Sequence, residues 1–190
     1  MNTPVIDMHS HVGNEPANGM VGDPELYVSI LDAAGVDRAP VSCLFYGDVS
    51  RCNDETAAFV AQNPDRFMGV AFVTPFYPEQ AIGELERAFD VLGMVFLKLY
   101  PSYVRQPIDD EVYRPIMEWC NSRSVIVKCH TEYMAGSNTY TDPDRFIGLA
   151  QKYPNCRWIL AHSGNVHEGQ LRAIAAAKSS RNIYLETCTS

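Results

Sequence analysis

Short apolar runs recur along the chain, separated by stretches in which apolar residues repeat at helical spacing. The runs are rich in β-branched and aromatic residues and are bounded by Gly, Pro, Asn or Asp, which is typical of strands. The expected strands cover residues 5–13, 39–45, 66–74, 94–100, 124–130, 157–162 and 182–187. Their nearly unbroken apolar character favours parallel strands that are covered on both faces.

Helices are expected between these strands. Asp23-Pro24 gives an N-cap followed by proline at the first helical position, and Gly35 gives the same helix a left-handed stop. Further helices are expected to begin at Asp54, at Pro78, at Asp109 or Asp110, at Asp142-Pro143 and near Leu171. Strands that alternate with helices through short loops predict βαβ crossovers and a parallel sheet.

Length and composition fit one domain over residues 1–190, with 46% hydrophobic residues for its core. The formal charge of −8 and the pI near 5.0 argue against a nucleic-acid or anionic-membrane partner and favour a small-molecule substrate. No signal-peptide pattern or bilayer-spanning apolar run of roughly 20 residues is present, so a soluble, cytoplasmic protein is expected. Six scattered cysteines without a Cys-x-x-Cys motif predict reduced thiols.

Four histidines stand at the expected carboxyl ends of strands. His9 and His11 lie two residues apart in the first strand and therefore share a face, while His130 ends the fifth strand and His162 the sixth. A closed (β/α)₈ barrel gathers its chemistry at these strand ends, whereas a doubly wound open sheet does so only near one switch point. Histidines from strands one, five and six converge more easily in a ring, so the predicted fold class is α/β, a TIM-like (β/α) barrel.

Three of these strands carry motifs that resemble the amidohydrolase superfamily. They are Ile-Asp-Met-His-Ser-His at residues 6–11, Val-Ile-Val-Lys-Cys-His-Thr at 125–131 and Ile-Leu-Ala-His-Ser-Gly-Asn at 159–165. The pattern is similar to the amidohydrolase-related branch, which includes aminocarboxymuconate-semialdehyde decarboxylase and various lactone and amide hydrolases. The resemblance implies that His9, His11 and His130 ligate one divalent ion, with zinc expected and Mn²⁺ or Fe²⁺ as alternatives. It also implies that His162 lies beside that ion.

The resemblance implies an enzyme in which imidazole ligands leave the metal an open coordination position for an activated water. The leading expectation is a metal-dependent hydrolase of an amide, lactone or similar carbonyl, with His162 polarising the substrate or shuttling protons. The alternative is a non-oxidative decarboxylase, a lyase, acting on an unsaturated or aromatic acid, since the same branch supports both reactions. A TatD-like nuclease ranks lower, because Lys98-Leu99-Tyr100 stands where that group has a metal-binding glutamate.

Residues that follow the predicted strands could recognise a planar carboxylate, namely Tyr46, Tyr100, Tyr103, Arg105 and Tyr133. Lys98 is expected to line the pocket, with a carbamylated metal bridge and a purely structural lysine as alternatives. Lys128 shares the face of His130 by alternation, at a position where the family usually has an apolar residue. It either pairs with Asp7 below the metal or turns outward at a bulge, because a lone buried ammonium is costly.

Two carboxylates and one further histidine have open roles. Glu132 and Glu186 lie at or just beyond strand ends, where they could hydrogen-bond a ligand or a metal-binding histidine, or be ordinary loop carboxylates. His167 lies near a helix start and is expected to be a solvated surface residue.

An eighth strand is missing from the pattern. In the family an aspartate at its end ligates the metal and takes the water's proton, yet no Asp follows Asp144. We therefore expect a barrel truncated after about seven strands, a piece of a longer protein, because such barrels typically need about 250 residues. If the chain ended at Ser190, its first and seventh strands would be open edges that invite a homo-oligomer. An inactive metal-binding barrel fragment is then a further alternative.

Overall fold

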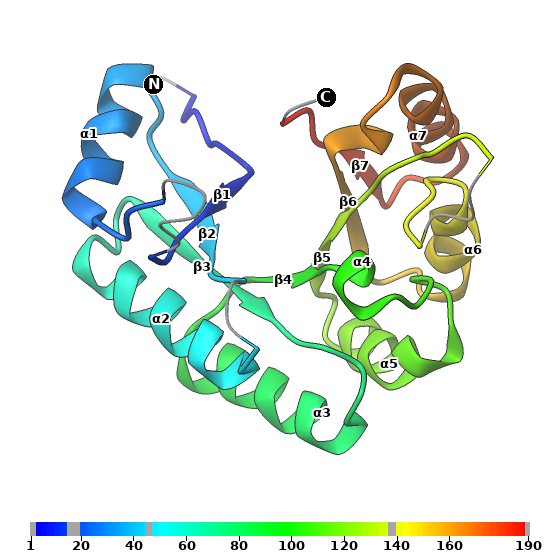
Figure 1. Ribbon diagram of the computed structural model, residues 1–190, viewed down its shortest axis with the longest axis horizontal. Coiled ribbons are helices and arrows are strands. Elements are labelled where there is room, and N and C mark those ends of the chain that lie inside the picture. The colour runs from blue at the N-terminus through cyan, green and yellow to red at the C-terminus, as the bar shows by residue number, and fades with distance from the viewer. Residues whose placement is uncertain (1–2, 15–19, 45–46, 137–139, 189–190) are drawn as a thin grey trace. The chain divides into compact units, whose positions relative to one another are not determined.

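The computed structural model describes residues 3–14, 20–44, 47–136 and 140–188. They form two compact units, one built from residues 1–72 and 85–95 and the other from residues 73–84 and 96–190 (Figure 1). Strands and helices alternate along the described chain as the sequence predicts. Each unit is described by itself below, as unit 1 and unit 2.

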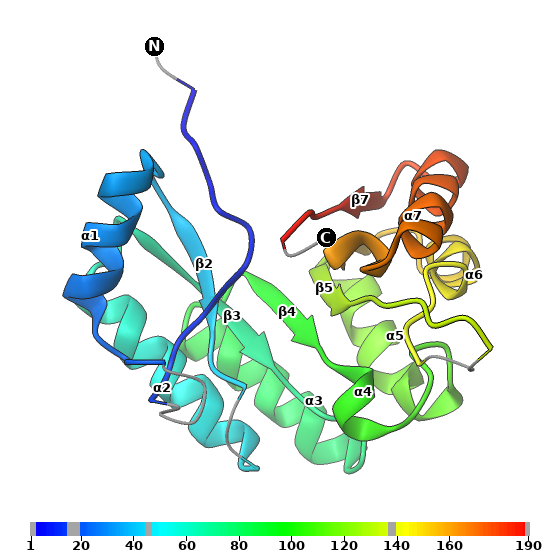
Figure 2. The same cartoon turned by 45° about the horizontal axis from the view of Figure 1, so that its top comes forward.

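Unit 1 contains three parallel strands, two long helices and a π-helical turn. In chain order these are β1 (Ser10–His11), α1 (Pro24–Ala34), β2 (Ala39–Ser42), α2 (Val49–Gln62), β3 (Phe67–Phe72) and the turn Arg87–Val91. Strand β2 lies between β1 and β3 and is buried along its whole length. Helix α2 packs on β2 and β3 (Figure 2), where the ring of Phe59 lies 4.9 Å from that of Phe67.

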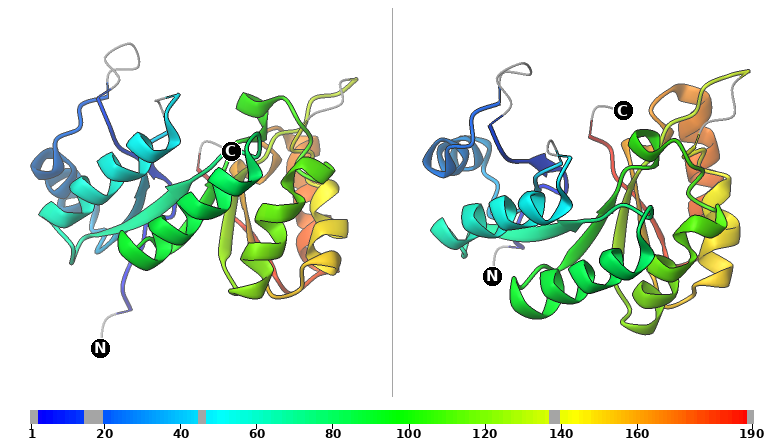
Figure 3. Two further views of the ribbon diagram at one scale, coloured as in Figure 1. Left: turned by 90° about the horizontal axis from the view of Figure 1, so that it is seen from below. Right: turned by 60° about the horizontal axis from the view of Figure 1, so that its bottom comes forward.

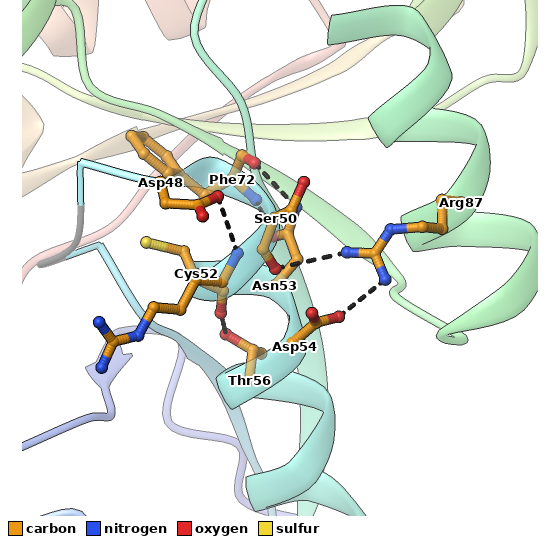
Figure 4. A network of polar contacts seen from close by, with 9 residues as sticks. Asp48, Ser50, Cys52, Asn53, Asp54, Thr56, Phe72 and Arg87 are labelled. Carbon is orange, nitrogen blue, oxygen red and sulfur yellow. Dashed lines mark hydrogen bonds and ion pairs between the residues drawn. The ribbon is translucent and has the colours of Figure 1, made fainter. Parts of the chain in front are cut away.

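Two buried polar residues of α2 fix this helix to the ends of β2 and β3. The Asn53 side chain donates to the Phe72 carbonyl at 3.0 Å and accepts from the Phe72 N–H at 2.8 Å (Figure 4). The Thr56 hydroxyl accepts from the Cys43 N–H at 2.9 Å and donates to the Cys52 carbonyl at 2.8 Å. Asn53 and Thr56 are fully buried, so these bonds give partners to backbone groups that water does not reach. Leaving such a group without a partner would destabilise the fold.

The start of α2 differs from the prediction. Asp48 is the N-cap and accepts from the Arg51 N–H at 3.2 Å, so the expected start at Asp54 is wrong. Asp54 instead pairs with Arg87 at 2.7 Å (Figure 4). That partner comes from a distant segment, so the helix pattern alone could not reveal it.

Unit 2 contains four parallel strands, of which neighbours in sequence are neighbours in the sheet. The strands are β4 (Phe96–Leu99), β5 (Ile126–His130), β6 (Arg157–Ala161) and β7 (Ile183–Leu185). The helices are α4 (Pro101–Val104), α5 (Arg114–Ser122), α6 (Arg145–Lys152) and α7 (His167–Ser179), with 3₁₀ turns at Glu111–Tyr113 and His162–Gly164. Helix α3 (Pro78–Glu86) leads back into unit 1.

Helices α5, α6 and α7 line one face of the unit 2 sheet (Figure 3). Trp158 of β6 points to this side and packs on Phe146 of α6, with ring centroids 5.9 Å apart. Because side chains alternate along a strand, the opposite face carries Lys98, Lys128 and His130. The candidate catalytic residues of unit 2 therefore lie on the side of the sheet away from the helices.

The first strand is shorter than predicted. Beyond β1, the only described pairing of its early residues is an isolated bridge between Ile6 and Arg38. Val5 is 52% exposed and Ile6 is 42% exposed, residues 7–11 are half-buried and Val12 is buried, so the prediction of a buried strand is wrong for most of the segment. Phe45 and Tyr46 lie outside the described residues.

Other predictions are confirmed by the described residues. Asp23 caps α1, and Gly35 ends it with φ of 67°. All six cysteines are free thiols, five of them buried, and His167 is exposed. Among the described helices, none combines the length and the apolar composition needed to cross a bilayer.

Candidate metal and catalytic site

Unit 1 brings the side chains of His9 and His11 together at the end of β1. Their Nε2 atoms lie 3.1 Å apart, and the rings meet edge to face at 74°. Two nitrogens that each lie 2.0–2.1 Å from a tetrahedral zinc ion are about 3.3 Å apart. The pair therefore has the spacing of two ligands on one divalent ion, as the alternation of side chains predicts.

The surroundings of His11 bear on which ring nitrogen carries the proton. Its Nδ1 lies 3.4 Å from the Ser42 carbonyl oxygen and 3.3 Å from the Ser42 hydroxyl. The carbonyl can only accept, whereas the hydroxyl can also donate, so the carbonyl contact favours the tautomer with the proton on Nδ1 and the lone pair on Nε2. Asp7 holds the chain in place beside the two histidines, because its carboxylate accepts from the His9 N–H at 3.0 Å and from the Ser10 hydroxyl at 2.8 Å.

In unit 2, His130 ends β5 within a stack of three rings. The Tyr100 ring lies 4.5 Å from His130 at 16°, and Tyr103 stacks on the far side of Tyr100 at 4.0 Å. The His130 Nδ1 is buried and has no hydrogen-bond partner among the described residues, while its Nε2 lies 3.6 Å from a Glu132 oxygen. Burial, followed by the nearby positive charges of His162 and Lys98, lowers the pKa of His130 to about 4. The ring is therefore neutral at pH 7 and can act as a ligand.

His162 lies directly after β6 and next to His130, with ring centroids 4.7 Å apart at 64°. Its Nδ1 lies 2.8 Å from the Cys188 carbonyl, and its backbone N–H donates to a Glu186 oxygen at 3.3 Å. The two histidines predicted from the fifth and sixth strands are thus neighbours. His162 also has a left-handed backbone, with φ of 65°.

Lys98 and Lys128 form a buried row one step below His130. They face each other across β4 and β5 in register, and both are fully buried. The interpretation in which a bulge turns Lys128 outward is therefore wrong, while its pairing with Asp7 stays a prediction. Burial, followed by the charge of Lys128, lowers the pKa of Lys98 to about 7. That Lys98 lines the substrate pocket also stays a prediction.

Several contacts of the site were not predicted. Ser102, on the unpredicted helix α4, donates to Glu132 at 3.0 Å. The stacking of Tyr100 on Tyr103 is a further such contact, since the sequence pattern shows only that both residues follow a strand. Tyr133 packs under the guanidinium of Arg172 at 4.3 Å. Arg105 is exposed, and Tyr46 lies outside the described residues.

The family model described as Amidohydrolase (Amidohydro_2) matches residues 6–189 of the chain. The chain belongs to the amidohydrolase family. The predicted superfamily and the prediction of an amidohydrolase-like enzyme are confirmed at the level of this family.

The chain is 27% identical to a 2-amino-3-carboxymuconate-6-semialdehyde decarboxylase from Dictyostelium discoideum, over 59% of this chain and 36% of the relative. It thus spans about a third of that curated protein. An uncharacterized TIM-barrel protein from Bordetella bronchiseptica superposes with a TM-score of 0.79 at 20% identity, over 98% of this chain and 76% of that one. A dihydroxybenzoic acid decarboxylase from Polaromonas, with bound manganese and the inhibitor 2-nitroresorcinol, gives 0.66 at 20% identity, over 97% and 78%. These likenesses confirm the predicted TIM-like fold class.

Each unit by itself supplies imidazole nitrogens of the kind that bind divalent ions. Unit 1 supplies two imidazole nitrogens at ligand spacing, and unit 2 supplies His130, whose buried Nδ1 has no partner within the described part of the chain. Neutral imidazole nitrogens are common ligands for zinc and other transition metals. That His9, His11 and His130 share one ion, with His162 beside it, stays a prediction.

Proposed function

We propose that the protein catalyses the non-oxidative decarboxylation of an unsaturated or aromatic acid. The observation that carries the proposal is the ring stack of Tyr103, Tyr100 and His130, which places a flat aromatic wall beside the imidazole of His162. A planar, conjugated substrate can lie against such a wall. The curated relative and the manganese-bound structural neighbour also carry decarboxylase names, which favours this reaction over hydrolysis, the leading expectation from the sequence.

The reaction needs a proton at carbon as the carboxylate leaves. When the bond to the carboxylate breaks, carbon dioxide departs and the electron pair stays on the substrate carbon, which then takes one proton. We assign this delivery to His162, because its Nδ1–H is bound by the Cys188 carbonyl, so Nε2 would be the atom that takes up a proton from solvent and passes it to the carbon. The Tyr100 hydroxyl keeps its proton, since burial, followed by the influence of Tyr103, raises its pKa to about 12.

His9, His11 and His130 would hold a divalent ion, with zinc expected and manganese as the alternative found in the structural neighbour. When bound, the ion would supply a positive charge that orients the substrate and stabilises the negative charge developing during bond breaking. The partner is therefore a small carboxylic acid. The buried row of Lys98 and Lys128 adds positive charge on the same face of the sheet as His130.

The test is release of carbon dioxide from a panel of hydroxylated benzoates and unsaturated dicarboxylates by the metal-loaded protein, with amides and lactones assayed in parallel. We expect turnover of acids only. The His162→Gln variant should lose about 10²-fold or more of the rate, the range for loss of a general acid. The matched control His167→Gln changes an exposed histidine of α7 and should retain the rate. Turnover confined to amides or lactones would make hydrolysis the correct reaction.

A further inference from the structure

The segment that follows β7 folds against His162 through one buried carboxylate. Glu186 is only 8% exposed. One of its oxygens accepts the His162 N–H at 3.3 Å, and the other accepts the Cys188 N–H. Its own N–H donates to the Leu160 carbonyl at 3.2 Å, which continues the pairing of β6 with β7. Glu186 thus joins the end of β6 to the chain after β7.

These bonds hold a backbone conformation that L-residues rarely adopt. His162 and Ser163 have φ of 65° and 45°, in the left-handed region that glycine favours. The Ser163 hydroxyl donates to the Glu186 carbonyl at 2.8 Å. Glu186 therefore contacts both residues, one through its carboxylate and the other through its main chain. Such conformations persist only where the surrounding contacts over-determine them.

The same segment fixes the protonation pattern of the imidazole. The His162 Nδ1 lies 2.8 Å from the Cys188 carbonyl oxygen, which can only accept, so Nδ1 carries the proton. The N–H of Cys188 is bound in turn by the Glu186 carboxylate. The carboxylate therefore fixes the histidine backbone and also the residue that accepts the ring proton.

We propose that Glu186 is a positioning residue that holds His162 in its Nδ1–H tautomer and presents Nε2 for proton transfer. The inference rests on the proposed function, because it assigns a purpose to the Nε2 atom. A competing role exists, since burial lowers the pKa of Lys98 and the negative charge of Glu186 partly offsets this, so Glu186 could serve only to neutralise the buried lysine row. The positioning role predicts a change at the imidazole, whereas charge neutralisation alone does not.

The test compares Glu186→Ala and Glu186→Gln with the matched control Glu168→Gln, which alters an exposed carboxylate of α7. Long-range ¹H–¹⁵N spectra of the zinc-loaded chain report the tautomer of His162, whose signals are assigned by their loss in His162→Gln. Zinc suits the measurement because it is d¹⁰ and redox-inert. We expect one Nδ1–H tautomer in the unchanged protein and in the control, and a mixture of both tautomers in Glu186→Ala.

The Gln variant keeps the inference testable if Glu186→Ala fails to fold. A glutamine amide has one accepting oxygen, so either the His162 or the Cys188 amide must lose its acceptor and exchange at least about 10-fold faster. An unchanged tautomer in Glu186→Ala would overturn the proposal. If that variant does not fold, unchanged tautomer and unchanged exchange of both amides in Glu186→Gln would overturn it.

Activity separates this inference from the proposed function. In Glu186→Ala we expect decarboxylation to lose about 10- to 100-fold in kcat, as for residues that orient a ligand or catalytic group, with KM changed less than kcat. If the tautomer shifts in Glu186→Ala but neither the unchanged protein nor any variant decarboxylates an acid, the proposed reaction is refuted and the positioning role stands. Turnover that falls while the His162 ring signals stay unchanged would refute the positioning role alone.

Discussion

Each unit carries a pair of histidines, and the two pairs are built in different ways. His9 and His11 come from one strand, two residues apart, and they are oriented by the half-buried Asp7 and the buried Ser42. His130 and His162 come from adjacent strands, where the ring of Tyr100 stacks on His130 and the buried Glu186 carboxylate accepts the His162 N–H. A pair within one strand is fixed by side-chain alternation, whereas a pair across strands depends on contacts between distant segments.

The largest effect is expected from removing one ligand of either pair. If both pairs serve one ion, His11→Ala and His130→Ala should each weaken metal binding by more than about 100-fold, beyond the loss typical of an orienting neighbour. Chelator competition followed by elemental analysis measures the affinity and the number of ions bound. His167→Ala, at the exposed histidine of α7, is the control. Unchanged affinity in His130→Ala would show that the His9 and His11 pair binds without unit 2.

A second prediction concerns the buried polar brace of unit 1. Asn53→Ala removes two hydrogen bonds from the backbone of Phe72 and should lower the free energy of unfolding by about 2–4 kcal/mol. Gln62→Ala lies at the exposed end of the same helix and should stay within about 0.5 kcal/mol. Urea unfolding of the metal-free chain measures both. Equal stability of the two variants would mean that the bonds of Asn53 exchange with water at no cost.

Local signals allowed much of the fold to be predicted. The Asp23 cap and the Gly35 stop of α1 depend on residues next to each other in sequence, and both are confirmed. Asp54 could not be placed correctly, because its partner Arg87 comes from a distant segment. Val5 and Ile6 read as a buried strand, since β-branched residues favour strands whether or not a neighbour covers them.

In the candidate site, too, features that depend on neighbouring residues were predictable, and features that depend on distant segments were not. The spacing of His9 and His11 predicts their approach directly, and the strand ends predict that His130 neighbours His162. The ring stack on His130 and the carboxylate of Glu186 were not predictable in detail. Each depends on the path of a short segment at the end of a strand, helix α4 in one case and the chain after β7 in the other. Such segments follow tertiary contacts more than sequence pattern.

The buried lysine row gives unit 2 a pH dependence. The pKa of Lys98 is lowered to about 7 from 10.5, so the folded state binds fewer protons than the unfolded state between these values. Stability should therefore rise with pH across this window, by up to about 1.4 kcal/mol per pH unit. Lys128→Met removes a cause of the lowered pKa and should flatten the rise. Urea unfolding of the metal-free chain at pH 7, 8 and 9 measures it; an identical slope in both proteins would contradict the coupling.

The smallest effect is expected at the brace between the two histidine-bearing strands of unit 2. The fully buried Thr131 hydroxyl donates to the Ala161 carbonyl at 2.6 Å and accepts the Gly164 N–H at 3.0 Å. Thr131→Val keeps the shape but leaves the Gly164 N–H without this acceptor, whereas the Ala161 carbonyl keeps the Thr131 N–H as a donor. The expected cost is about 1–2 kcal/mol, less than for Asn53→Ala, because a single group loses its partner.

Hydrogen exchange sharpens this last comparison. The Gly164 amide should exchange faster in Thr131→Val, while amides of α2 in unit 1 stay unchanged, because the lost bond lies within unit 2. Ser122→Ala, at the exposed end of α5, is the control and should alter neither. An unchanged Gly164 amide in Thr131→Val would mean that the turn after β6 is held by its other bonds. Those include the contact from the Tyr133 N–H to the Gly164 carbonyl at 3.1 Å, and the brace would then be irrelevant to how His162 is held.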